Sequence, residues 1–113
     1  ASIVGPTGNY SISGGARMHA FATRGGVFDL YGLSGSGKTL TISANITFST
    51  AFVYADPLAM IYAVASARTI SLGAFTVTGK RYISAAGAVV YTEGGGANYF
   101  PGTVAGTGAG VYA

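Results

Sequence analysis

Cysteine and tryptophan are absent from this 113-residue chain, and histidine occurs once, at His19. Without thiols the chain forms no disulfide and has no thiolate nucleophile, and a single imidazole is a poor basis for a zinc site. The three acidic residues, Asp29, Asp56 and Glu93, are isolated in the sequence, so nothing indicates a carboxylate pair for acid–base chemistry. We therefore predict no catalytic residue, no metal and no cofactor, and interpret His19 as an ordinary strand residue.

Charge is also scarce. Charged residues make up 8% of the chain against an average of about 25%, while apolar residues make up 50% and the mean hydropathy is +0.48. The six cationic residues are scattered, which is not the basic stripe of a nucleic-acid-binding protein. The longest apolar run, residues 51–67, is interrupted by Asp56 and Pro57, so we expect no membrane span. No charged segment precedes an early apolar core, so we also expect no Sec-type signal peptide. Such a chain is expected to bury surface against other copies or partners.

Residues 32–39, GLSGSGKT, match the nucleotide-binding pattern G-x-x-x-x-G-K-[ST]. That loop binds phosphate only when a helix begins after the lysine, here Lys38. Residues 40–48 instead alternate between apolar and polar side chains, which predicts a half-buried strand. We therefore interpret residues 34–37 as a Gly/Ser turn between two antiparallel strands, and a P-loop enzyme remains the less favoured alternative.

The remainder of the chain also predicts strands separated by glycine turns. Gly25-Gly26 is interpreted as a hairpin link and Gly73 as a β-bulge. After Asp56-Pro57 a helix is possible, but strand is favoured because helix formers are sparse in this Gly/Thr/Ser-rich background. The predicted strands are residues 16–24, 27–33, 39–53, 58–65, 69–78 and 81–92. The similar stretches GKTLTISANITF, from Gly37, and GKRYISAAGAVVY, from Gly79, are interpreted as like hairpins and not as a repeat.

These patterns predict one all-β domain, an antiparallel sandwich or partly open barrel with extended N- and C-terminal arms. The predicted divisions are an N-terminal arm at 1–15, the β domain at 16–92 and a Gly-rich C-terminal arm at 93–113. Aromatic residues dominate interface energies. The predicted subunit interface is therefore formed by the tail residues Tyr99, Phe100, Pro101 and Tyr112.

The closing segment, TGKRYISAAGAVVYTEGGGANYFPGTVAGTGAGVY, resembles the end of small structural virion proteins of tailed bacteriophages. Its KRY…VVYT strand, Gly-rich link, YFPG turn and G-x-Y end carry the resemblance. SIVGPTG near the start, DLYG and TLTISANITF are also similar to that group. Residues 109–112, AGVY, depart from the Gly-Gly-x-Tyr ending of such proteins, which leaves a place on the capsid or on the tail open.

The resemblance implies a structural protein of the virion, a capsid decoration or cement protein, that is assembled in the host cytoplasm. Its expected partners are other copies of itself, as a trimer if it decorates a capsid, and a capsid or other virion protein. The near alternative is a tail or head fibre component that binds a receptor or a glycan. On this interpretation the protein binds and does not catalyse.

Overall fold

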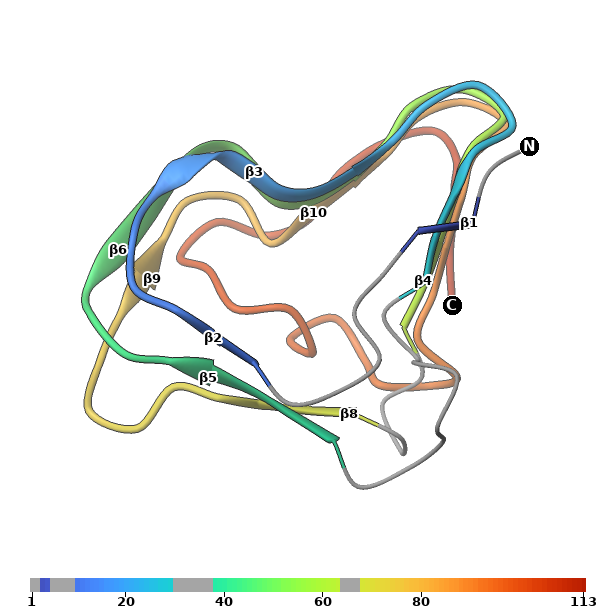
Figure 1. Ribbon diagram of the computed structural model, residues 1–113. Coiled ribbons are helices and arrows are strands. Elements are labelled where there is room, and N and C mark those ends of the chain that lie inside the picture. Colours follow the sequence, from blue (N-terminus) through green and yellow to red (C-terminus); the bar gives the residue numbers. More distant parts are fainter. Residues whose placement is uncertain (1–2, 5–9, 30–37, 64–67) are drawn as a thin grey trace.

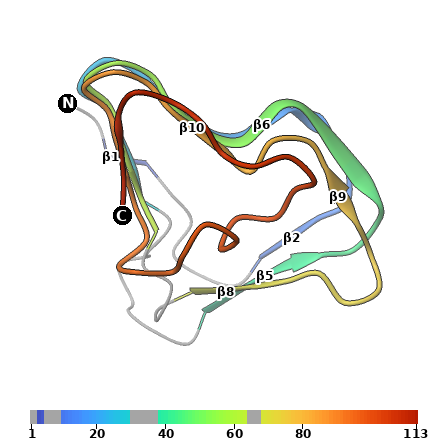
Figure 2. The same cartoon turned by 180° about the vertical axis from the view of Figure 1, so that it is seen from behind.

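The chain winds as a three-sided parallel β-solenoid, returning to the same sheets on successive circuits (Figure 1; Figure 2). This computed structural model describes residues 3–4, 10–29, 38–63 and 68–113. The described residues form strands and turns and no helix, as the sequence predicts. We call one circuit through the three sheets a coil.

The widest sheet has five strands, which run parallel to one another. In sheet order they are β1 (Ile3–Val4), β4 (Val27–Asp29), β7 (Met60–Tyr62), β11 (Val89–Tyr91) and β12 (Val111–Tyr112). Each strand pairs with the equivalent strand of the next coil, so successive coils stack through backbone hydrogen bonds.

The other two sides are built in the same way. The four-stranded sheet contains β3 (Ala16–Ala22), β6 (Ile46–Ala55) and β10 (Tyr82–Ser84), with β9 (Val77–Thr78) also paired to β6. The three-stranded sheet contains β2 (Tyr10–Ile12), β5 (Lys38–Ile42) and β8 (Arg68–Ser71). In this sheet Tyr10 pairs with Leu40 and Leu40 with Ile70, so the same number of residues separates its successive strands.

The predicted antiparallel sandwich or partly open barrel is therefore wrong, because the described strands pair in parallel. The link at Gly25-Gly26, which we interpreted as a hairpin, is a corner between sheets, while the turn predicted at residues 34–37 lies outside the described part. At Arg24 and Gly25, where φ is 28° and 73°, the chain leaves β3 and enters β4, which belongs to another sheet. A hairpin would have returned the chain alongside β3.

Corners also divide the long predicted strands. The predicted strand at 39–53 is β5 and β6 with a corner between them, and the predicted strand at 81–92 is β10 and β11. The bulge predicted at Gly73 is the corner between β8 and β9, with φ at 55°. The strand interpretation after Asp56-Pro57 is confirmed by β7, while residues 64–67 lie outside the described part.

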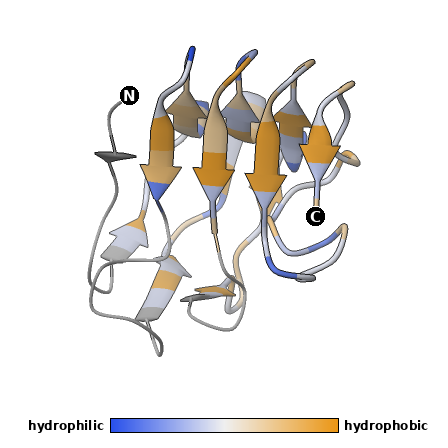
Figure 3. Ribbon diagram, turned by 90° about the vertical axis from the view of Figure 1, so that its right-hand side faces the viewer, coloured by the Kyte–Doolittle hydropathy of each residue, from blue (hydrophilic) through white to orange (hydrophobic). Residues whose placement is uncertain are grey.

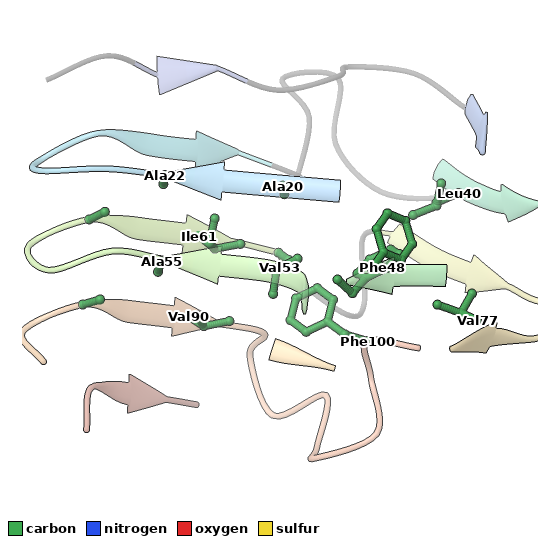
Figure 4. Packing of buried hydrophobic residues seen from close by; sticks show 14 of the residues in the cluster. Ala20, Ala22, Leu40, Phe48, Val53, Ala55, Ile61, Val77, Val90 and Phe100 are labelled. Atoms are coloured by element: carbon green, nitrogen blue, oxygen red, sulfur yellow. The ribbon is translucent and has the colours of Figure 1, made fainter. Parts of the chain in front are cut away.

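Alternating side chains fill the interior of the coils (Figure 4). Leu40 and Ile42 of β5 and Ile46 and Phe48 of β6 are buried, which confirms the predicted inward face of that segment. The five-stranded sheet contributes an inward column whose central members, Ile61 and Val90, are fully buried. The solenoid therefore has one continuous core that passes from coil to coil.

The segments predicted as extended arms belong to the coils wherever they are described. Within residues 1–15, β2 pairs with β5. Within residues 93–113, β12 pairs with β11, and Val104 and Thr107 form bridges to Lys80 and Ile83 of the preceding coil. The C-terminal segment is the last coil of the solenoid.

Candidate interaction surfaces

The described residues contain no group of histidine and acidic side chains that could hold a metal ion, and no helix suited to crossing a membrane. His19 lies in β3 with its ring centroid 4.9 Å from that of Phe52, which places it in aromatic packing. The P-loop motif lies mostly outside the described part, but Lys38 and Thr39 begin strand β5. A strand therefore stands where a phosphate-binding loop requires a helix.

The four residues predicted as a subunit interface gather at one end of the core. Phe100 is fully buried and Pro101 is buried, while Tyr99 and Tyr112 are half-buried. The ring centroids of Tyr99 and Tyr112 lie 5.0 and 6.4 Å from that of Phe100. Within the chain these side chains hold the tail against its own core, and their assignment to a subunit interface stays a prediction.

Two further aromatic residues, which the sequence analysis did not single out, complete this group. Tyr82 of β10 stacks on Tyr112, with centroids 3.8 Å apart and planes at 9°. Phe52 of β6 lies 6.0 Å from Phe100. We call Phe52, Tyr82, Tyr99, Phe100 and Tyr112 the aromatic cap, because together they close the core beneath the last coil.

Hydrogen bonds fix the last coil onto the cap. Tyr112 Oη donates to the Gly96 carbonyl at 2.6 Å. Arg81 Nη1 donates to the Phe100 carbonyl at 2.9 Å, and Ser84 Oγ donates to the Val111 carbonyl at 2.8 Å. Burial raises the pKa of the Tyr112 phenol above its ordinary value of 10.0, and a hydrogen bond with Thr92 partly opposes this shift. The phenol is therefore held in its neutral form.

The outer face of the five-stranded sheet carries a row of apolar side chains. Its pairing register aligns Val27 with Met60, Met60 with Val89, and Val89 with Val111. These side chains lie on the face opposite the buried Ile61 and Val90. We call this row the outer apolar ladder; the apolar character of these strands is visible in Figure 3.

A second outward column lies beside the ladder. It aligns Asp29 with Tyr62 and Tyr62 with Tyr91. The two tyrosine rings stack with centroids 5.4 Å apart and planes at 23°. Among the described residues of these two columns, Asp29 carries the charge and the others are uncharged.

The other two outer faces differ in chemistry. The three-stranded sheet aligns Ser11, Thr41 and Ser71, which form a hydroxyl row. The four-stranded sheet presents Phe21, 45% exposed, in edge-to-face contact with Tyr54 at 5.4 Å. Among the described residues, the aligned apolar row of the five-stranded sheet has four members, Val27, Met60, Val89 and Val111, and is longer than the row of Phe21, Tyr54 and Ile83 on the four-stranded sheet.

One signal in the sequence pointed to the outer apolar ladder. The alternation after Pro57 predicts a strand that is apolar on both sides, with Met60 on one side and Ile61 on the other. One side of that strand faces the core, so the other presents apolar groups outward. What the sequence did not indicate is that Val27, Met60, Val89 and Val111 are neighbours, because that follows from the parallel register.

Comparison of the chain with protein families, with curated proteins and with solved structures finds no match.

Proposed function

We propose that the protein is a structural component of a tailed-bacteriophage particle, in a fibre or spike. The observation that carries this proposal is the stack of parallel coils, in which strands of successive coils pair with one another along one axis. Such a fold lengthens by adding coils and so suits an elongated, rigid part. The resemblance of the closing segment to phage virion proteins supports the same proposal.

The described tail favours the fibre over capsid decoration. A cement protein that clasps its neighbours needs an extended segment free to reach another subunit. In this chain Phe100 is covered by its own core, and Tyr112 stacks on Tyr82 of the preceding coil. The predicted clasp is therefore engaged within the chain, which removes the main argument for a cement role.

Immunogold electron microscopy of purified virus particles tests the proposal. An antibody raised against the folded protein is expected to label the tail or a fibre, whereas pre-immune serum gives no label. Label over the capsid faces would favour decoration, the earlier expectation, and would contradict the fibre. Particles that carry no label and contain no peptide of this chain by mass spectrometry would overturn the virion assignment.

A further inference from the structure

We propose that the outer apolar ladder, formed by Val27, Met60, Val89 and Val111, is the interface between copies of this chain that lie side by side and parallel. The location differs from the aromatic tail residues that the sequence indicated. The parallel orientation rests on the proposed fibre function, in which all chains run in one direction. The contact itself does not depend on where the protein resides.

The first argument is exposure of apolar groups on a rigid surface. Val111 is 53% exposed, and Val27, Met60 and Val89 keep part of their surface outside the core. The strands that carry them are paired into the five-stranded sheet, so binding does not have to order a flexible segment. The loss of conformational entropy on association is correspondingly small.

The second argument is the spacing of the ladder. Its members sit on adjacent parallel strands, so they repeat about every 4.8 Å along the solenoid axis. A partner surface fits between these side chains when it has the same repeat. A parallel copy of the chain provides that repeat in register, with Met60 opposite Met60 of the other copy.

The third argument is charge. Among the described residues of the ladder and of the column beside it, the charged one is Asp29, which lies at one end of that column. A charged partner would lose hydration on this face without gaining an ion pair. A copy of the same face is uncharged over Met60 and Val89, and the whole chain is only 8% charged.

The size of the ladder sets the strength of the contact. Four residues on adjacent strands span roughly 14 Å, so the patch is at the small end of specific interfaces. We therefore expect association in the micromolar range and not in the nanomolar range. Sedimentation equilibrium at micromolar to millimolar protein is the measurement that covers this range.

The first experiment compares two valines that differ in position but not in exposure. Val111 belongs to the ladder and is 53% exposed; Val104 lies in the same coil, away from the ladder, and is 51% exposed. We expect Val111→Asp to weaken self-association about tenfold or more, because it buries an unpaired carboxylate. Val104→Asp is expected to leave association unchanged. Equal effects of the two variants, or a wild-type chain that stays monomeric at millimolar concentration, overturn the proposal.

The second experiment tests the orientation of the copies. The Met60→Asp and Met60→Lys variants are each expected to be monomeric when pure and to associate with each other when mixed. In parallel copies, residue 60 of one copy faces residue 60 of the other, so the mixture pairs opposite charges. Rescue of Met60→Asp by Val89→Lys instead would show antiparallel copies, which keeps the interface but contradicts a fibre. If no mixture restores association, the ladder is not the interface. Circular dichroism of each variant establishes that it is folded before it is scored.

Discussion

The second coil, formed by β5, β6 and β7, and the last coil, residues 93–113, bury their apolar groups in different ways. In the second coil, inward side chains such as Leu40, Val53 and Ile61 fill the interior at full burial. In the last coil, glycines bring the backbone itself onto the coil below, and a Cβ at Gly106 would overlap the ring of Tyr82. A Gly-rich segment therefore closes this core by close backbone approach, aided by the aromatic cap.

The difference explains why composition was misleading for the tail. Residues 93–113 contain too few large apolar side chains to form a core of their own, and on that basis we predicted an arm. They need no core of their own, because Phe52 and Tyr82 of earlier coils supply rings on which the tail's Phe100 and Tyr112 pack. Glycine here permits close contact where it usually signals freedom.

Among the substitutions that test this difference between the coils, we expect Phe100→Ala to lower stability the most. Phe100 is the tail's fully buried large side chain, with the rings of Phe52 and Tyr99 nearby. We expect the free energy of unfolding, measured by chemical denaturation, to fall by about 4 kcal/mol. Phe21→Ala makes the same chemical change at a site that is 45% exposed and is expected to cost much less. Similar losses at the two sites would mean that the tail does not help to close the core.

A glycine series separates close approach from backbone strain. Gly108 has φ at 130°, and an added Cβ would overlap the Ser84 carbonyl, so Gly108→Ala is expected to cost roughly 3 kcal/mol. Gly94 has φ at 75° but open space around it, so its alanine variant is expected to cost roughly 1 kcal/mol.

Gly14 is the control for this series, because it has neither constraint. Gly14→Ala is expected to change stability by no more than about 0.5 kcal/mol in denaturant titrations. If Gly108→Ala and Gly94→Ala cost the same, backbone conformation alone explains the tail glycines. Close packing of the last coil onto Ser84 would then contribute nothing to stability.

The smallest expected effect comes from Tyr112→Phe, which keeps the ring on Tyr82 and removes the hydroxyl that donates to Gly96. At neutral pH we expect a loss of about 1 kcal/mol or less. Because burial raises the pKa of Tyr112, its unfolded form loses the proton first as pH rises. The contribution of Tyr112 to the stability of the wild type is then intact below about pH 10 and is lost as pH rises through its folded pKa.

Urea titrations from about pH 8 to about pH 11 measure this dependence. The wild type is expected to lose more stability over that range than Tyr112→Phe, because only the wild type carries the Tyr112 hydroxyl. Parallel pH profiles for the two proteins would show that Tyr112 ionises equally easily in the folded and unfolded states.

The sequence predicted the strands and many of their inward faces, but not how the strands pair. Alternation identified Leu40, Ile42 and Phe48 as one face, and all three are buried. A corner and a hairpin both use glycine at positive φ, as at Gly25 and Gly73, so local chemistry did not distinguish them. The pairing partner is decided by contacts a full coil away in the sequence.

The repeat was missed because its coils are unequal. We compared GKTLTISANITF with GKRYISAAGAVVY, which matches Thr39 to Arg81, whereas the register pairs Thr39 with Thr69. For the same reason, the sequence identified only part of the residues that form candidate interaction surfaces. Tyr99, Phe100 and Tyr112 do gather as a group, but the ladder joins Met60 to Val27 and Val89, which no local pattern connects.

The unequal coils make the molecule narrower at its two ends than in its middle. The strand positions on the five-stranded sheet move from 3 to 27, then to 60, to 89 and to 111, so the first and last coils are shorter than the two between them. A full-width coil laid on either narrow end would overhang it and leave backbone groups without partners. The taper therefore disfavours the end-to-end growth by which open β edges produce uncontrolled fibrils.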